Sequence, residues 1–257
     1  MEPLTLMFGV RSYETGVDNR LSLPSVCNYF QEAAGEHAHR LGFGIFKLQQ
    51  EGLSWVLSRL HLRVEGRLSW GDRVTLETWP CGLRGRLSAL RDFRGTVDGG
   101  EGRFEGVSEW LVVDLAGRRI VRPPAAFCDL VSAPAPRVAL AGEQGGGKFA
   151  VLGRTDAVSR VLVRRSDHDF NDHVNNVHYV EWALEPVAGV EAWSGRVPAE
   201  IDIVFRQSAH AGDEVESRLE IVDGVTLRHA LVRLSDGALL VTAETKWSDG
   251  ASESDRD

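Results

Sequence analysis

Two stretches of the chain repeat apolar residues at the spacing of one helix face. In the first, Ser22 and Pro24 are typical of a helix start, and Gly42 and Gly44 are typical of its end. The second runs from Val174 to Leu184 and has a large apolar face. We therefore expect one amphipathic helix in each half of the chain.

Most of the remaining sequence alternates apolar and polar residues over short segments, which predicts strands. In the first half the segments are residues 55–64, 74–79, 88–96 and 108–115. In the second half they are residues 161–164, 200–207, 214–222, 227–234 and 239–247. The pattern favours an α+β fold in which strands surround a single helix, and it occurs twice.

Shared local features indicate an internal duplication. Gly71-Asp72 precedes one alternating segment and Gly212-Asp213 precedes another, an offset of 212 − 71 = 141 residues. Between the halves, breaker residues at Pro123-Pro124, Ser132–Pro136 and Gly145–Gly147 indicate a linker. We predict an N-terminal domain over 1–131, a linker over 132–150, a C-terminal domain over 151–249 and a flexible tail over 250–257.

Composition limits the classes of function. Hydrophobic residues make up 43% and charged residues 26% of the 257 residues, as in soluble globular proteins. There is no apolar run of about 18 residues, and the first five residues lack the features of a secretory signal, so we expect a cytoplasmic protein without a membrane span. The net charge of −8 argues against nucleic-acid binding.

The sequence also lacks the patterns of several kinds of site. Cys27, Cys81 and Cys128 are too widely spaced for a metal cluster, and we interpret them as small buried residues. The eight histidines lack the spacing of a zinc motif. Neither a Gly-x-Ser-x-Gly segment nor a phosphate-binding glycine loop is present. We expect neither a metal nor a cofactor.

The densest polar segment of the chain leads into the second predicted helix. Asp169, Asn171 and His173 alternate there, so an extended or looped backbone would direct all three side chains the same way. Such a set can orient and deprotonate a water molecule. The first helix amides, around Val174, Asn175 and Asn176, could stabilise an oxyanion. By residue type alone, ordinary helix caps and a surface histidine explain the segment equally well.

The segment Asp169–Trp182 closely resembles the Asp-x-Asn-x-His-Val-Asn-Asn…Tyr…Trp motif of plant and bacterial acyl-acyl carrier protein (acyl-ACP) thioesterases. The resemblance extends over about residues 8–247. In the first half it rests on Arg11–Glu14, Gln31–His37, Trp55–Arg59, Thr78-Trp79, Arg91–Phe93, Ser108–Asp114, Arg118-Arg119 and Arg122–Pro124.

The resemblance implies a double hotdog fold, with two tandem halves that each wrap a curled antiparallel sheet around a long helix. It also implies hydrolysis of fatty acyl-ACP in fatty acid biosynthesis, with Asp169, Asn171 and His173 as catalytic residues. Asp169 and His173 would activate the water together. Asn171 would hold the water or the thioester carbonyl. Which of Asp169 and His173 takes the proton is open.

One position departs from the family pattern. Members often carry a Glu, sometimes Glu-Cys, after the helix, and these positions align with Ser208 and Ala209. A serine cannot act as a carboxylate base, although its hydroxyl can hold a water. Either the acid is supplementary in this protein or its activity is reduced, so one alternative function is that of a catalytically weak acyl-binding protein. An acyl-CoA thioesterase is a second alternative in the same chemical class. A cysteine nucleophile at this position is excluded, and we place His210 on a turn.

Two further groups concern the substrate and its carrier. An acyl chain needs an apolar pocket, whose candidates are Val26, Tyr29, Phe30, Ala33, Ala34, Trp55, Leu57 and Trp79, although each is equally well explained as a core residue. Arginines suit an acidic carrier protein or a phosphopantetheine phosphate, and the candidates are Arg84, Arg86, Arg91, Arg94, Arg118, Arg119 and Arg122. Coenzyme A would suit them too.

The tandem halves are compatible with a monomeric pseudo-dimer or a homodimer.

Overall fold

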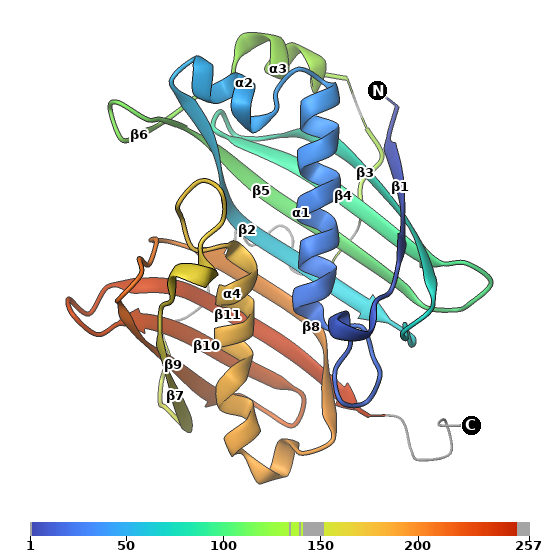
Figure 1. Cartoon of the computed structure of the whole chain (residues 1–257), viewed down its shortest axis with the longest axis vertical. Coiled ribbons are helices and arrows are strands. Elements are labelled where there is room, and N and C mark those ends of the chain that lie inside the picture. Colours follow the sequence, from blue (N-terminus) through green and yellow to red (C-terminus); the bar gives the residue numbers. More distant parts are fainter. Residues whose placement is uncertain (1, 134, 139, 141–151, 251–257) are drawn as a thin grey trace. The chain divides into compact units, whose positions relative to one another are not determined.

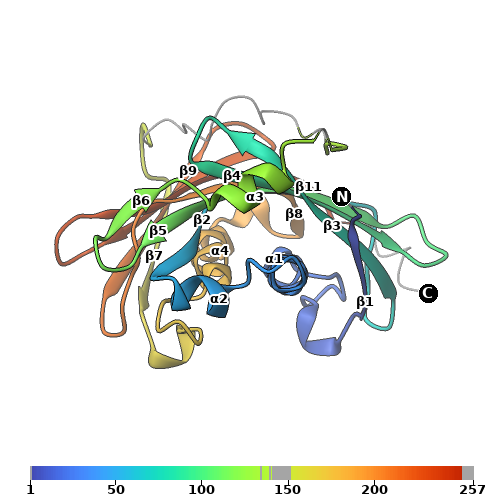
Figure 2. The ribbon, with the colours of Figure 1, turned by 90° about the horizontal axis from the view of Figure 1, so that it is seen from above.

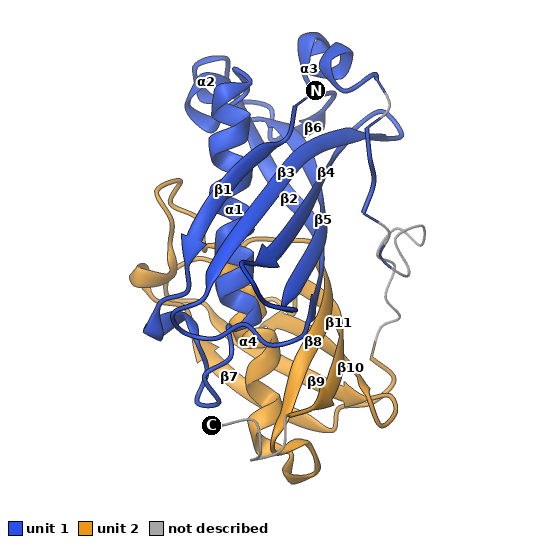
Figure 3. Ribbon diagram, turned by 90° about the vertical axis from the view of Figure 1, so that its right-hand side faces the viewer, with its two compact units in different colours: residues 1–144 blue, residues 145–257 orange. Residues whose placement is uncertain are grey.

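The computed structural model describes residues 2–133, 135–138, 140 and 152–250. The chain forms two compact units, residues 1–144 and 145–257 (Figure 3). Of the predicted linker and tail, Gly145–Gly147 and residues 251–257 lie outside the described residues. The predicted domain boundaries stay a prediction.

The first predicted helix is confirmed as α1 (Leu23–Arg40). It begins where the side chain of Ser22 accepts a hydrogen bond from the Ser25 amide, at 3.2 Å. It ends before Gly42, whose φ of 82° needs a residue without a side chain. Its apolar face is buried, including Val26, Phe30 and Ala33.

In unit 1 the strands are β1 (Leu4–Gly9), β2 (Leu53–Glu65), β3 (Arg73–Arg84), β4 (Ser88–Val97), β5 (Arg103–Asp114) and β6 (Arg119–Val121). They form an antiparallel sheet in the order β1-β3-β4-β5-β2, with β6 beside β5 (Figure 1). The four predicted strands of this half are confirmed. The sequence reading missed β1 and β6, and also the short helices α2 (Ile45–Gln50) and α3 (Ala125–Leu130).

Helix α1 lies on the concave side of this sheet (Figure 2). The ring of Phe30 stacks on Phe93 of β4, with ring centroids 4.2 Å apart. It also lies so close to β5 that a Cβ atom at Gly106 would overlap it. Glycine at this position therefore lets the helix approach the sheet.

The opposite face of the same sheet is covered by part of the predicted linker. Val138 and Leu140 are buried against Trp79 and Val107. The Trp79 Nε1 atom donates a hydrogen bond to the Pro136 carbonyl at 2.8 Å. These described linker residues thus pack as part of unit 1.

In unit 2 the strands are β7 (Ala157–Leu162), β8 (Arg196–Phe205), β9 (Glu214–Ile221), β10 (Thr226–Arg233) and β11 (Leu239–Asp249). Their order is β8-β11-β10-β9-β7, again antiparallel. Each of the five predicted segments overlaps one of these strands. β7 and β8 begin four residues before the predicted start and end two residues before the predicted end.

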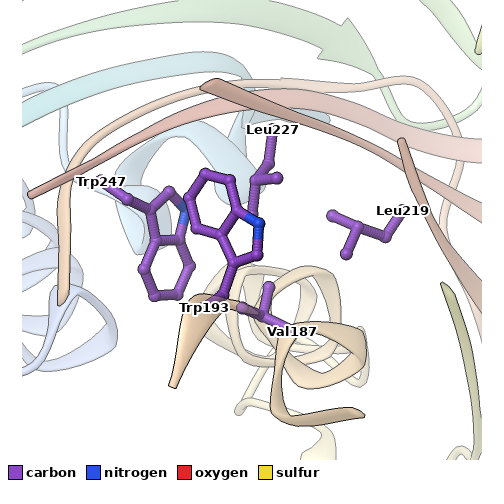
Figure 4. Close-up of a cluster of buried hydrophobic side chains, with 5 residues drawn as sticks. All are labelled: Val187, Trp193, Leu219, Leu227 and Trp247. Carbon is purple, nitrogen blue, oxygen red and sulfur yellow. The ribbon is translucent and has the colours of Figure 1, made fainter. Parts of the chain in front are cut away.

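The second helix is shorter than the first. Helix α4 (Asn176–Leu184) has 9 residues against 18 in α1. After it the chain continues as two 3-10 helices, η4 (Glu185–Gly189) and η5 (Glu191–Trp193). They supply Val187 and Trp193, which pack on the sheet residues Leu219, Leu227 and Trp247 (Figure 4). The 3-10 helices thus cover sheet surface that a long helix would otherwise cover.

The predicted Gly-Asp turns have the same geometry in both units. Gly71 and Gly212 each have a φ of 93°. The Asp72 carboxylate accepts from the Ser69 amide at 2.7 Å, and the Asp213 carboxylate accepts from the His210 amide at 2.9 Å. This agreement supports the internal duplication.

No helix in the described part of the chain is long and apolar enough to cross a membrane.

Candidate active site

The alternating polar residues lie on a tight hairpin before α4, which we call the polar hairpin (residues 167–175). Backbone hydrogen bonds run from Asn175 N to Asp167 O at 2.9 Å and from Asp169 N to His173 O at 2.8 Å. A turn over residues 169–172 closes it, with Asp172 N donating to Asp169 O at 3.0 Å. Asp172 adopts a φ of 58°, which aspartate tolerates better than most residues.

The three predicted catalytic residues come together on this hairpin. The Asp169 carboxylate accepts from the Asn171 amide at 2.8 Å and from the Asn171 side-chain Nδ2 at 3.5 Å. His173 Nδ1 lies 2.8 Å from the backbone carbonyl oxygen of Asn171. Asn171 therefore links the carboxylate to the imidazole.

The contact at Nδ1 fixes the tautomer of neutral His173. A carbonyl oxygen can only accept a hydrogen bond, so Nδ1 carries the proton. The lone pair then lies on Nε2, and the side chain is exposed. This form of the ring is suited to take a proton from a water molecule.

The predicted oxyanion donors are only partly available. Asn175 is the N-cap of α4, and its side chain accepts from the Val177 amide at 3.1 Å. Its own amide donates to Asp167 O, so it is already used within the hairpin. Of the predicted set, the amides of Val174 and Asn176 remain as donors without an acceptor among the described residues.

Ser208 is exposed and lies after β8. The next amide, of Ala209, donates to the hydroxyl oxygen of Tyr179 on α4 at 2.7 Å. The carbonyl of Ser208 accepts from Arg233 Nη1 at 3.0 Å. The segment with Ser208 is thus attached to the helix that follows the polar hairpin. Burial raises the pKa of Tyr179, so its hydroxyl stays protonated.

The acyl-pocket candidates do not form one group. Val26, Tyr29, Phe30, Ala33 and Ala34 lie on the buried face of α1. Leu57 is buried on β2, whereas Trp55 packs edge-on against Phe127 of α3. Trp79 is in the cluster covered by Val138 and Leu140, on the sheet face opposite to α1. The structure therefore separates Trp79 from the helix residues with which it was grouped.

Arg91, predicted to bind the carrier, lies instead in the core of unit 1 and is 6% exposed. Its Nη1 atom donates to His37 Nδ1 on α1 and to Thr78 Oγ1 on β3, both at 3.1 Å. Burial lowers the pKa of Arg91 to about 10. Burial and the facing guanidinium lower the pKa of His37 to about 4. A carrier protein cannot reach this guanidinium without a rearrangement of the core.

The other candidate arginines divide into paired and available groups. Arg84 forms an ion pair with Glu109, Arg94 with Glu105 at 3.5 Å and Arg119 with Asp114 at 3.5 Å. Arg86, Arg118 and Arg122 are exposed and have no carboxylate partner within the described ranges.

Two more exposed arginines, Arg164 and Arg165, lie just before the polar hairpin. The Arg164 backbone amide donates to Asp167 Oδ2 at 2.8 Å, and His168 and, to a smaller extent, Arg165 lower the pKa of Asp172. Neither guanidinium forms an ion pair among the described residues. The sequence reading missed them because they lie outside the first-half cluster. Their position next to the predicted catalytic motif could have identified them as candidates from the sequence.

The polar hairpin has a structural copy in unit 1, over residues 14–22. Ser22 N donates to Glu14 O at 3.0 Å, Gly16 N to Arg20 O at 2.9 Å and Asn19 N to Gly16 O at 3.0 Å. Asn19 has a φ of 57°. The offset is 167 − 14 = 153 residues, so Gly16, Asp18 and Arg20 stand where unit 2 has Asp169, Asn171 and His173. The same backbone conformation therefore occurs in both units, with different side chains.

No group of three or more His, Cys, Asp or Glu side chains is placed to hold a metal ion in the part of the chain that the structure covers.

Comparison with known proteins identifies the class. The solved 12:0-ACP thioesterase from Umbellularia californica matches with a TM-score of 0.83 and 26% identity, over 96% of this chain and 97% of that one. An acyl-ACP thioesterase from Bacteroides thetaiotaomicron shares the fold, with a TM-score of 0.81 and 20% identity over 96% of this chain and 98% of that one. These matches confirm the α+β double hotdog fold.

Family models then identify the group within this class. The acyl-ACP thioesterase N-terminal domain matches residues 4–131, and the acyl-ACP thioesterase C-terminal domain matches residues 153–249. The chain therefore belongs to the acyl-ACP thioesterase family, as its resemblance implied.

Curated plant proteins are similar over much of the chain. The dodecanoyl-[acyl-carrier-protein] hydrolase of Cinnamomum camphora is 30% identical over 97% of this chain and 68% of its own length. The oleoyl-acyl carrier protein thioesterase 1 of Arabidopsis thaliana is 31% identical over 70% of this chain. The matched region spans 53% of the length of the Arabidopsis protein.

Proposed function

We propose that the protein hydrolyses fatty acyl-ACP thioesters to free fatty acids. The observation that carries the proposal is the hydrogen-bonded chain from Asp169 through Asn171 to His173, on a hairpin directly before a helix. It provides a base and an adjacent polar side chain in one segment. Family membership and the names of the plant relatives support the choice of substrate.

In this mechanism His173 Nε2 removes a proton from water because Nδ1 is held protonated by the Asn171 carbonyl. The water oxygen attacks the thioester carbonyl carbon. Amides of Val174 and Asn176 stabilise the oxyanion. The C–S bond then breaks, the thiolate takes the proton from His173, and the carboxylic acid is released.

Asp169 has an orienting role in this scheme. Its carboxylate accepts both hydrogen bonds from Asn171, so it fixes the residue whose carbonyl orients the imidazole. Removal of its charge would loosen Asn171 and His173 together. Of Asp169 and His173, we therefore propose His173 as the base that takes the proton.

An acyl-binding protein with little turnover is the second candidate, and the position of Ser208 favours it. The hydrogen bonds to Tyr179 and Arg233 hold the Ser208 segment beside α4, where a serine cannot act as a carboxylate base. Such a protein would bind acyl ligands and release no thiol.

The carrier is proposed to bind through exposed arginines whose guanidinium groups form no ion pair among the described residues. Arg164 and Arg165 join Arg86, Arg118 and Arg122 as candidates, whereas Arg91 is removed from the set because it is buried. Guanidinium groups suit both an acidic helix and a phosphate. An acyl-ACP and an acyl-CoA substrate must therefore be compared directly.

The test is thiol release from acyl-ACP and acyl-CoA substrates, from dodecanoyl to oleoyl chains. His173→Ala and Asp169→Asn are expected to lower kcat by about a hundredfold or more. His210→Ala is the matched control, because it removes another exposed histidine of unit 2, and the hydrogen bond from His210 to Asp213 is donated by the backbone amide, which the variant keeps. Ligand binding without thiol release would instead support the acyl-binding protein.

A further inference from the structure

A second histidine of the polar hairpin makes a contact that the mechanism above does not use. His168 directly precedes Asp169, and its side chain is 11% exposed. Its Nδ1 atom lies 3.0 Å from Asp172 Oδ1. The pair spans the turn that carries Asp169 and Asn171, so it joins the two ends of that turn.

The backbone forms this turn without such a pair. In the unit 1 copy, Thr15 and Asn19 stand where unit 2 has His168 and Asp172. Thr15 Oγ1 donates to the Ser12 carbonyl, and Asn19 Oδ1 accepts from the Trp70 amide. Because the two backbones make matching hydrogen bonds, the turn forms without a side-chain pair, and the His168–Asp172 contact restrains a turn that the backbone already makes.

Burial of the polar imidazole of His168 costs free energy, and an imidazole is not needed merely to fill the space. A carboxylate only accepts, so His168 Nδ1 carries the proton. In either protonation state its Nε2 atom is buried without a hydrogen-bond partner among the residues described. An apolar side chain would fill the same space without that penalty. The contact with Asp172 is the hydrogen bond that the imidazole makes among the described residues, and it accounts for an imidazole at this position.

We propose that His168 is a positioning residue for the thioesterase reaction, an inference that rests on the proposed function. Asp172 lies between Asn171 and His173 in the chain. When His168 holds Asp172, the Asn171 carbonyl stays in place to orient His173 Nδ1. Loss of the contact lets that carbonyl move, so fewer molecules have a correctly oriented imidazole.

The kinetic test uses His168→Phe, which keeps a ring and removes the donor, together with Asp172→Gly and the double variant. Glycine removes the acceptor and adopts the φ of 58° at this position without strain. Each single variant is expected to lower kcat about fivefold with KM unchanged, as for a pair whose carboxylate is exposed to solvent. The double variant is expected to lose no more than either single one, because both remove the same contact. His168→Asn is expected to recover most of the rate, since its Nδ2 occupies the place of Nδ1.

The matched control is His178→Phe, which removes a similar histidine–carboxylate pair, to Glu181 at 2.8 Å, from α4 outside the hairpin. It is expected to leave kcat unchanged. Wild-type kcat in His168→Phe, or losses that multiply in the double variant, would overturn the proposal. A lower unfolding temperature with unchanged kcat would show a purely structural role.

Hydrogen exchange, followed by NMR, separates this inference from the proposed function. The Asp169 and Asp172 amides close the hairpin and are expected to exchange faster in His168→Phe than in the wild type. If the wild type hydrolyses no thioester, the proposed function fails, and the exchange rates still decide whether His168 holds the turn. Equal rates in both proteins would refute the positioning role.

Discussion

Two buried histidines are expected to make the folded protein sensitive to mild acid. His37 in unit 1 faces Arg91, and His229 in unit 2 is 1% exposed with its Nε2 atom 2.8 Å from Thr245 Oγ1. Burial lowers the pKa of each from 6.5 to about 4. Both are therefore neutral in the folded protein at a pH where the unfolded chain binds protons.

The sign and size of the effect follow from these values. Because the folded-state pKa is lowered, the unfolded chain takes up protons first, so stability is full above pH 6.5 and falls as the pH decreases towards 4. At about pH 5 each histidine is expected to lower the free energy of unfolding by about 2 kcal/mol. Together they remove about 4 kcal/mol, a large part of the stability of an ordinary domain.

The assay is urea unfolding at about pH 7.5 and about pH 5, followed by tryptophan fluorescence. His37→Asn keeps an acceptor for Arg91, and His229→Gln keeps a polar group for Thr245, but neither side chain titrates. Each is expected to reduce the pH dependence by about 2 kcal/mol relative to the wild type. His210→Asn, at an exposed site, is the control. If the variant that combines His37→Asn with His229→Gln loses as much free energy of unfolding in acid as the wild type, the reasoning is wrong.

Four other changes test separate parts of the structure. Ser208→Glu restores a carboxylate beside α4 and is expected to raise kcat severalfold; no gain would show that this position takes no part in water activation. Replacing both Arg164 and Arg165 with Gln is expected to raise KM for acyl-ACP about tenfold at low salt and less at high salt, whereas Arg160→Gln, which removes an ion pair with Glu216, is the control that should leave KM unchanged. Asp92→Asn is expected to lower the free energy of unfolding by about 2 kcal/mol, because the buried carboxylate accepts from Val138 N and Arg137 Nε; the exposed Asp98→Asn is the control in the same urea titration. Finally, the unit 1 side chains can be placed on the polar hairpin, by Asp169→Gly, Asn171→Asp and His173→Arg. The unfolding temperature should stay within a few degrees and thiol release should stop, so a collapse of stability would show that these side chains also hold the fold.

The regular elements could be predicted because each follows a simple periodicity. Helix α1 has caps and an apolar face that are visible in the sequence, and the longer strands alternate. Strand β1 and helices α2 and α3 have only six residues each, too few for a clear period. Helix α4 ends at Leu184, and Pro186 follows in η4, where the 3-10 geometry replaces the α-helix.

The faces of the strands were harder to predict than the strands themselves. Thr78 and Trp79 are neighbours, so they point to opposite faces of β3. Thr78 faces α1, whereas Trp79 faces the segment around Val138. Sequence alternation shows that the faces differ, but it does not show which one meets the helix. The larger aromatic residue was therefore assigned to the wrong face.

Arg91 shows why charge alone does not identify a binding surface. Its burial depends on His37 and Thr78, which are 54 and 13 residues away in the sequence. Such partners become visible only when a helix and a neighbouring strand are placed together. The local motif around Asp169, by contrast, lies within five consecutive residues, so its grouping could be predicted without the fold.

The duplicated hairpin separates what the backbone provides from what the side chains provide. Residues 14–22 and 167–175 share their hydrogen bonds, an isolated bridge pair and a residue with positive φ. The unit 1 copy carries Arg20 at the place of His173, and a guanidinium group has no acceptor atom for a proton from water. It also has Gly16 at the place of Asp169, so no carboxylate is there to hold the next polar residue. The turn is therefore a scaffold that both units keep, and the proposed water chemistry depends on the few side chains that only unit 2 has.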